Sequence, residues 1–523
     1  MLIAPIRNSR VSRTQKASGA SLPAPTGGWD ALSPLAEMKA DKAIVLDNWI
    51  PRPDTVEVRR GHTIHAIGGL GGGVVDSLMA YHAVTSAGGK LFAGANSRIY
   101  DVTANATASA VVTSLSNNRW QHVNFTAAGG TKYLYCVNGA DSARAYDGST
   151  WSTPSISGGT SSTFINITAH KDRLWFIEKD TTKAWYLGSG AISGTATSVQ
   201  LGPAFDKGGF LVAAATMTRD GGAGSDDFLC FITSQGQVAV YSGTDPDDPE
   251  RWNQVGVFNL GAPIGYRCFT KVGADLALVN IDGVIPVSAA LGLDQSAQKQ
   301  IAMSADINDA MNAAARSYKS NFGWQLIAYP KDTLAILNVP ISAGATQYQY
   351  VMNTLTKAWC RFTGMNANCW EVFNDNLYFG GNSGYVFKAD NGGTDNGTPI
   401  DAVGKSAYNY FGSRGNTKSF LGLQPLLTTV SSARVSVGVS TDFRDNVTLG
   451  TPSAAVLGGA VYDTAVYDTD VYAIEDRAVS DWTAISGIGH CAAVHFRGSK
   501  DSETDVTMAL NGFNVMYQTG GPM

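Results

Sequence analysis

The residues best suited to chemistry lie together in one short acidic segment. Asp245, Asp247, Asp248 and Glu250 fall within six residues, and closely spaced carboxylate oxygens are ligands that suit Ca²⁺. Two prolines interrupt the segment, and the same composition is typical of an exposed turn. The sequence therefore leaves two interpretations open, a calcium-binding loop and a plain surface turn.

The cysteines and histidines show no spacing that predicts a metal site. The chain has six cysteines without a C-x-x-C pair, and its seven histidines have no ligand-type spacing to them. Most of the cysteines lie in apolar, strand-like runs, so we expect buried, reduced thiols and no bound metal or cofactor. The cysteines are Cys136, Cys230, Cys268, Cys360, Cys369 and Cys491.

Motifs of covalent or hydrolytic catalysis are missing from the sequence. There is no G-x-S-x-G elbow, no P-loop and no H-E-x-x-H pair. The turn Ser-x-Asp-x-Gly-x-x-Trp, which some catalytic propellers repeat, is approached once, at Ser242–Trp252, and the glycine is lacking there. Spacing alone nominates no pair of carboxylates for glycoside hydrolysis. We therefore predict that the chain is not an enzyme and has no catalytic residues.

The composition indicates which elements position these residues. Of 523 residues, 58 are glycine, 10% are aromatic and only 15% are charged, whereas soluble domains average about 25% charged residues. Such a composition favours strands joined by tight turns over helices with surface ion pairs. The net charge is −5, from 38 basic and 43 acidic residues, and this lack of a basic surplus argues against tight binding of nucleic acid.

One pattern recurs between residues 80 and 395. A short apolar strand with a leucine is followed by a polar turn and a second alternating strand, as in Lys90–Gly94 with Arg98–Asp101. Seven marker leucines recur at intervals of 40 to 58 residues, and this spacing is typical of propeller blades. We predict a β-propeller of about seven blades. The markers are Leu91, Leu134, Leu174, Leu229, Leu276, Leu334 and Leu377.

The remaining segments complete an all-β organisation. Residues 1–40 predict an extended N-terminal arm, residues 41–397 the propeller, and residues 398–523 a smaller, sandwich-like C-terminal β domain. One helix is expected over residues 305–316, with Ser304 as its N-cap.

Three tyrosines recur with a period of five in the C-terminal part. Tyr462, Tyr467 and Tyr472 stand in repeated Val-Tyr units, and an odd period places successive residues on opposite faces of a strand. The tyrosines are therefore either exposed contact residues or core residues.

The first residues do not resemble an export signal. Arg7, Arg10 and Arg13 are followed by no apolar run of the length that a signal peptide needs. No stretch approaches the length of a membrane span either. We expect assembly in the cytoplasm and no membrane span.

Two segments carry a pattern more specific than the blade repeat. The first segment comprises Gly28–Met38, Ala43–Pro51 and Arg52–Gly61, and the second comprises Tyr241–Trp252, Val255–Phe258 and Gly261–Gly265. Together with the repeated Tyr-Asp-Thr units and Asn511–Gly521, these segments resemble the tail nozzle, or packaged-DNA stabilisation, proteins of short-tailed bacteriophages. The likeness covers most of the chain.

The resemblance implies a structural virion protein of a short tail. It implies a homo-oligomer of about six copies, a hexamer, below the tail adaptor protein, which retains packaged DNA and conducts it during ejection. Further implied partners are tail fibres and double-stranded DNA that passes without tight binding. We expect assembly contacts at the N-terminal arm (Arg7, Arg10 and Arg13), at Trp29, Trp49 and Pro51, and at Tyr462, Tyr467 and Tyr472.

Other interpretations stay open at this point. Trp29 and Trp49 could equally fill the propeller's own core. The chain could be a receptor-binding or polysaccharide-degrading propeller of a phage tail, with a carboxylate-lined pocket on the propeller face. A third alternative is an interaction propeller unrelated to virions, which would stay monomeric.

Overall fold

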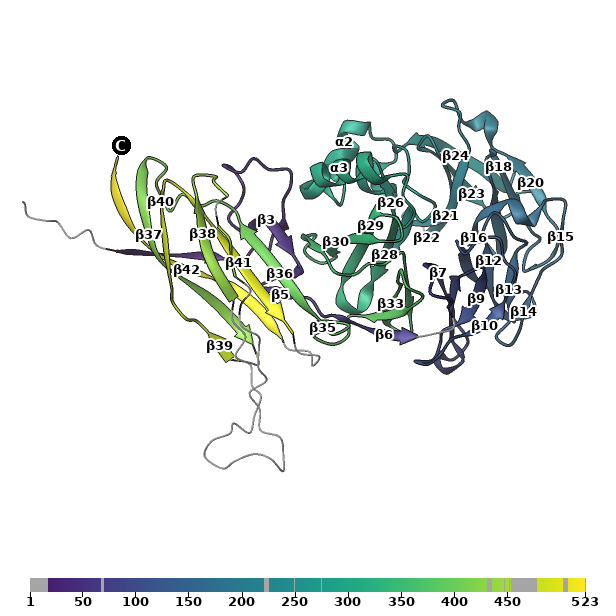
Figure 1. Cartoon of the computed structure of the whole chain (residues 1–523). Coiled ribbons are helices and arrows are strands. Elements are labelled where there is room, and N and C mark those ends of the chain that lie inside the picture. The colour runs from purple at the N-terminus through teal and green to yellow at the C-terminus, as the bar shows by residue number, and fades with distance from the viewer. Residues whose placement is uncertain are drawn as a thin grey trace, which may run out of the picture.

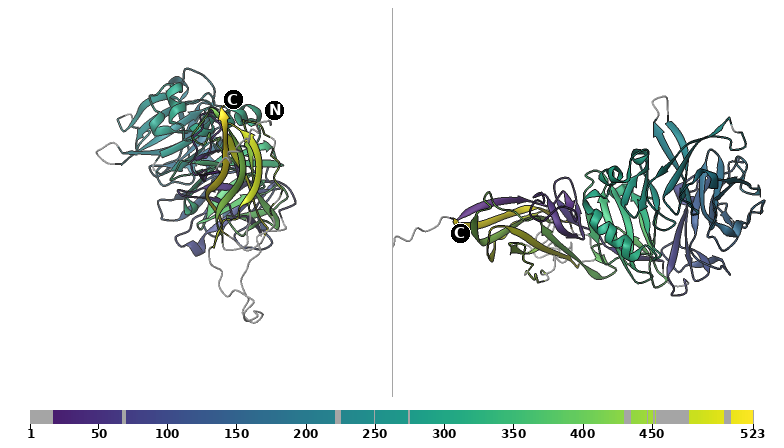
Figure 2. Two further views of the ribbon diagram at one scale, coloured as in Figure 1. Left: turned by 90° about the vertical axis from the view of Figure 1, so that its left-hand side faces the viewer. Right: turned by 90° about the horizontal axis from the view of Figure 1, so that it is seen from above.

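The protein consists of a β-propeller and a β-sandwich that lie end to end (Figures 1 and 2). The fold is all-β, as the composition predicts. The computed structural model describes residues 17–66, 70–220, 225–248, 250–273, 275–429, 435–445, 447–450, 452, 477–501 and 507–522.

The first four blades are four-stranded antiparallel sheets. Blade one contains β7 (Val75–Tyr81), β8 (Lys90–Ala95), β9 (Arg98–Asp101) and β10 (Ser109–Val112), and blade two contains β11 (Gln121–Thr126), β12 (Lys132–Val137), β13 (Arg144–Tyr146) and β14 (Trp151–Ser152). Blade three contains β16 (Phe164–His170), β17 (Arg173–Glu178), β18 (Lys183–Tyr186) and β20 (Thr197–Gln200), with β15 (Ile156–Ser157) and β19 (Gly194–Thr195) paired beside it. Blade four contains β21 (Leu211–Asp220), β22 (Ser225–Thr233), β23 (Gln237–Gly243) and β24 (Trp252–Asn259).

Three further blades bring the number formed by the described residues to seven. Blade five has three strands, β25 (Phe269–Val272), β26 (Asp275–Asn280) and β27 (Gly283–Pro286). Blade six contains β28 (Gln325–Tyr329), β29 (Leu334–Ser342), β30 (Thr346–Asn353) and β31 (Trp359–Phe362). Blade seven contains β32 (Cys369–Phe373), β33 (Asn376–Gly380) and β34 (Val386–Ala389), and its outermost strand is β6 (His62–Ala66).

The blades form a closed ring. The innermost strands β7, β11, β16 and β21 contact one another in turn, β21 contacts β26 of blade five, and β25, β28, β32 and β7 contact one another in turn. Blade seven is held by antiparallel pairing of β34 with β6, which comes from before blade one. The ring is therefore fastened between strands more than 300 residues apart in sequence.

The marker leucines confirm the repeat that the sequence indicates. Each lies on the second strand of its blade, counted from the axis, and each is buried. This strand is covered by neighbouring blades on both faces, so a large apolar side chain recurs there in every blade. The β-propeller is thus encoded locally, one hairpin at a time.

The expected helix is present in a modified form. The segment begins as a 3₁₀ turn, η4 (Ala305–Ile307), and continues as α3 (Asn308–Tyr318). The Ser304 hydroxyl accepts a hydrogen bond from the Val284 amide at 2.9 Å and does not cap this segment. Two further helices, which the sequence pattern did not predict, precede it and cover blade five. They are α1 (Val287–Ala290) and α2 (Gln295–Ile301). The other 3₁₀ turns are η1 (Ser86–Gly88), η2 (Ser161–Thr163), η3 (Gly202–Ala204) and η5 (Pro330–Asp332).

The sandwich combines strands from both ends of the chain. One sheet contains β1 (Ser18–Pro23), β4 (Trp49–Pro51), β5 (Val56–Val58), β37 (Asn416–Thr429), β39 (Arg477–Val479), β40 (Thr483–Gly489) and β42 (Met508–Pro522). The facing strands are β3 (Lys42–Asp47), β36 (Thr398–Ser406), β38 (Val435–Thr441) and β41 (Ala492–Lys500), and β2 (Gly28–Trp29) and β35 (Thr394–Asp395) pair at their margin.

Sheet membership differs from the expected division at residues 40 and 397. Within the expected arm, β1 pairs with β42 over its whole length, and within the expected propeller, β3 pairs with β36 and β5 pairs with β42. These pairings join segments more than 300 residues apart, so no local pattern in the sequence indicates them. Among the described residues, every helix is too short or too polar to cross a bilayer.

Candidate functional site: the junction and the axial cavity

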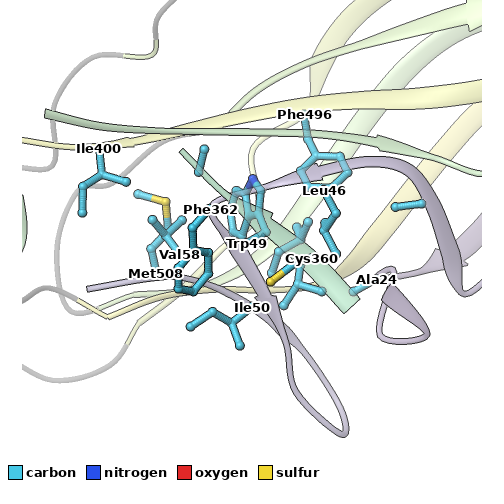
Figure 3. Packing of buried hydrophobic residues seen from close by; sticks show 14 of the residues in the cluster. Ala24, Leu46, Trp49, Ile50, Val58, Cys360, Phe362, Ile400, Phe496 and Met508 are labelled. Carbon is cyan, nitrogen blue, oxygen red and sulfur yellow. The ribbon is translucent and has the colours of Figure 1, made fainter. Parts of the chain in front are cut away.

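Trp49 lies where the propeller meets the sandwich and is fully buried, with none of its surface exposed. Its ring packs edge-on against Phe496 with 5.5 Å between the centroids, and Figure 3 shows Cys360 and Phe362 of blade six in the same cluster. A side chain in this position cannot touch another subunit. In this chain Trp49 therefore has no exposed surface for the expected assembly contact, because the residue fills the core between the two units.

Trp29 and Pro51 lie at the same junction. The Trp29 ring packs against Tyr350 at 5.2 Å, with the Arg361 guanidinium 5.9 Å from its centroid. Pro51 is buried, and its carbonyl accepts a hydrogen bond from the Asn353 side chain at 2.9 Å. The structure thus brings Trp29, Trp49 and Pro51 together, but as parts of an internal interface. The other expected contact residues, Arg7, Arg10, Arg13, Tyr462, Tyr467 and Tyr472, lie outside the described residues.

A buried ion pair joins the residue that follows β5 to strand β35, which pairs with β6. The Arg59 side chain, 1% exposed, donates to both carboxylate oxygens of Asp395 at 2.7 and 2.5 Å, and His62 approaches the same carboxylate at 3.0 Å. Burial acts to raise the pKa of Asp395, but the hydrogen bonds and charges of Arg59 and His62 outweigh it and lower the pKa to about 2. Both charges are therefore matched inside the protein.

The backbone around this ion pair is held by two further residues. Asn48 adopts a left-handed conformation, with φ of 61°, and its side-chain oxygen accepts from Arg59 at 2.8 Å and from the Thr363 amide at 2.9 Å. At Gly61 a Cβ would lie 1.8 Å from the Thr394 carbonyl oxygen, so only glycine fits. Both residues belong to the first segment of the phage-protein resemblance, whose local conformation thus serves the junction.

The acidic segment of blade four holds a turn in place. Asp245 pairs with Arg173 of blade three at 3.0 Å, Asp247 accepts a hydrogen bond from the Tyr186 hydroxyl, and Asp248 pairs with Arg251 at 3.3 Å. The three carboxylates therefore face separate partners. No group of three or more His, Cys, Asp or Glu side chains suited to a metal occurs in the described part of the chain.

The innermost strands enclose an axial cavity of about 490 Å³. Glu371 of β32 and His122 of β11 face each other across it, with 3.5 Å between Oε2 and Nε2. Burial raises the pKa of Glu371 to about 8, against smaller opposing effects of the Val372 amide and the Arg267 charge. Burial also lowers the pKa of His122 to about 4, assisted by the charges of Arg267 and His82. Near neutral pH the pair is therefore a carboxylic acid beside a neutral imidazole.

A second cavity, of about 540 Å³, opens where the innermost strands begin. We call it the channel mouth, meaning the opening beside the axial cavity of the propeller. It is lined by Arg119, Lys179, Arg267 and Lys319 together with Phe322. Arg267 also lines the axial cavity and so stands between the two. Sequence reasoning missed this site because its cations come from separate inter-strand connections and form no motif.

Comparisons with known proteins give no family. No family model matches the chain, and no curated protein matches it. All six cysteines are buried and unpaired, so no disulfide framework supplies a further signature.

Several solved structures are similar to the chain at low identity. The extracellular domain of a hybrid two-component system from B. thetaiotaomicron shares 11% identity, with a TM-score of 0.41. The match covers 75% of this chain and 47% of that chain. The chain thus spans about half of that protein's length. The WD40 β-propeller domain of Doa1 shares 7% identity (TM-score 0.37), and BBS1N, solved in complex with ARL6DN, shares 9% (TM-score 0.39); each match covers 63% of this chain and 96% of the other.

Proposed function

We propose that the chain is a structural virion protein of a short phage tail, which forms an oligomeric nozzle ring below the adaptor, retains packaged DNA and conducts it during ejection. No catalytic step belongs to this function. The observation that carries the proposal is the apolar core shared by the propeller and the sandwich, taken together with the sequence resemblance. A part that must withstand packaged DNA needs units that do not move independently.

The shared core argues for one rigid block. A single cluster of buried side chains includes Trp49 and Phe496 of the sandwich and Phe362, Trp370 and Phe379 of blades six and seven. Backbone pairing continues across the same boundary, because β3 pairs with β31 and β35 pairs with β6. Interfaces between mobile domains are smaller and more polar, so we expect the two units to act as one.

The outer face of the sandwich offers a surface for contacts between copies. Leu421, Trp482, Ile488 and Met516 are 36%, 52%, 72% and 36% exposed, and they lie on or beside the neighbouring strands β37, β40 and β42. We call them the outer-sheet patch. A Cβ on Gly422 would come within 3.1 Å of the Trp482 ring and 3.2 Å of the Met516 methyl, so these two side chains close over the glycine. Exposed apolar side chains gathered on neighbouring strands mark sites of association.

The charge of the chain fits a conduit for DNA. A net charge of −5 gives no general affinity for phosphate, and each cationic contact would slow the passage of a polyanion. The junction arginines are also neutralised internally, as in the pairs of Arg59 with Asp395 and Arg361 with Asp47.

The mass of the purified protein in solution tests the proposal. We expect a ring of about six copies, alone or on adaptor rings, and so a mass of about 330 kDa for a chain of 55.1 kDa. Removal of residues 1–16 keeps β1 and should leave a folded chain that no longer assembles. The point variant Trp482→Ser, in the outer-sheet patch, should also weaken assembly without unfolding the protein, because the side chain is exposed. A chain that stays monomeric with adaptor rings present would contradict the proposal.

A second candidate is a receptor-binding or polysaccharide-degrading propeller of the tail. The axial cavity favours it, because the cavity holds the uncharged Glu371 carboxyl close to the cationic channel mouth. Release of sugar from host capsule by the purified protein, lost in Glu371→Gln, would support this candidate over the nozzle.

A further inference from the structure

The channel mouth gathers positive charge from four separate connections. Arg119 precedes β11, Lys179 follows β17, Arg267 precedes β25 and Lys319 follows α3. No Asp or Glu lies among the described residues that line this cavity. In a chain with more acidic than basic residues, such a one-sided lining makes the mouth a local positive field.

These four cations differ from those elsewhere in the protein. Within the described parts of the chain, none of them lies within 4.0 Å of a carboxylate. The junction arginines, in contrast, are held by carboxylates at hydrogen-bond distance, as in the 2.6 Å contact of Arg361 with Asp47. The described part of the mouth therefore has no ion pair of its own. The charge of Asp76, which does not line the cavity, acts on both Arg119 and Arg267 from a greater distance.

Arg267 shows this most clearly. Its Nη2 donates to the Asp76 carbonyl at 2.9 Å and to the Trp120 carbonyl at 3.4 Å, whereas its buried Nη1 has no hydrogen-bond partner among the described residues. A buried guanidinium nitrogen without a hydrogen-bond partner is costly, and no carboxylate among the described residues pairs with this one directly. The missing interaction is one that an anion at the base of the mouth would supply.

Phe322 arranges two of the cations around the opening. The Arg119 guanidinium lies 4.0 Å from the Phe322 ring centroid, and the Arg267 guanidinium lies 5.5 Å from it. Stacking on a ring fixes a guanidinium while leaving its N–H edge free to bind an oxyanion. One arginine is exposed and the other half-buried, so together they span the depth of the mouth.

We propose that the channel mouth binds a small polar ligand through an oxyanion group, a carboxylate or a phosphate. Arg119 and Arg267 hold the oxyanion, and Lys179 and Lys319 provide the surrounding positive field. A cavity of about 540 Å³ has the size of small-molecule sites. This binding is independent of the nozzle function, since it needs only a single folded chain.

Titration of the full chain with two separate probes, inorganic phosphate and glucuronate, tests the proposal. Calorimetry measures the binding of both probes, and ³¹P NMR gives a second measurement for phosphate. We expect millimolar or tighter binding of at least one probe, weakened by added salt. The double substitution Arg119→Gln with Lys319→Gln should weaken it about tenfold or more. Preference for one probe identifies the oxyanion as phosphate or carboxylate.

The matched control is Lys331→Gln. Lys331 is exposed and lies in η5, at the other end of β28, so this variant removes one charge without touching the mouth. Its affinity should equal that of the unchanged protein. Absence of binding of both probes, or equal affinity in the double variant and the control, would overturn the proposal. Because binding is measured on the folded chain, the outcome does not depend on whether rings form.

Discussion

The junction and the channel mouth both gather arginines, but they treat their charge in opposite ways. At the junction, Arg59 is 1% exposed and makes two hydrogen bonds to Asp395. At the mouth, the Arg267 guanidinium donates to the backbone carbonyls of Asp76 and Trp120, and Arg119 stacks on Phe322. The first arrangement closes a charge inside the protein, and the second leaves it available.

The two arrangements should therefore affect different properties, the stability of the fold and the binding of ligands. Removing one partner of a matched buried pair lowers the free energy of unfolding, because the other partner is left charged in a low dielectric. An unmatched cation in an open cavity contributes little to the fold and attracts an anion from solution. We therefore expect substitutions at the junction to change stability and substitutions at the mouth to change ligand binding.

The largest expected effect is that of Trp49→Ala. Its side chain is fully buried between the two units, and removing a buried tryptophan costs about 3–5 kcal/mol of the free energy of unfolding. Chemical denaturation should show this loss as one concerted transition of both units. The control Trp482→Ala, in the exposed outer-sheet patch, should cost less than about 1 kcal/mol. Independent melting of propeller and sandwich would show that the core does not unite them.

A comparable effect is expected for Asp395→Asn. The change leaves Arg59 charged and buried, at a cost of about 3 kcal/mol or more. The pKa of Asp395 is lowered to about 2, so its contribution to stability is present above about pH 4 and is lost as the pH falls toward 2. Denaturation at several pH values measures both. Asp401→Asn, in the exposed pair with Arg497, should cost less than about 1 kcal/mol; equal losses would contradict a special role for the junction pair.

A smaller effect of opposite sign is expected for Glu371→Gln in the axial cavity. The pKa of Glu371 is raised to about 8, so its contribution to stability is present below its ordinary pKa and is lost as the pH rises toward 8. The neutral variant should avoid this loss. Its free energy of unfolding, relative to the unchanged protein, should rise by about 1 kcal/mol or more between about pH 5 and pH 8. A difference independent of pH would show that the carboxyl ionises normally.

The propeller could be predicted because each blade repeats a local signal. The marker leucines and the hairpins around them lie within about ten residues of one another, as in β8 and β9. The helix could be predicted for the same reason, since Met311 and Ala314 recur at helical spacing and are buried. Its irregular start could not, because Ser304 binds the amide of Val284 in another element.

The junction and the mouth depend on distant pairings that leave no local trace. Strand β6 completes blade seven, although the sequence shows only a short polar segment around His62 and Thr63. His122 and Glu371 meet only because their strands both face the axis. Tryptophan is common both in cores and at contact surfaces, so the sequence alone does not place Trp49. Its burial depends on partners from distant parts of the chain.

The most direct test of the proposed function is electron microscopy of the purified protein, alone and mixed with adaptor rings. We expect rings with several copies of the two-part block, seated below the adaptor and surrounding an open passage for DNA. Separate particles of a single chain, with adaptor rings left bare, would contradict a role as a building part of the tail.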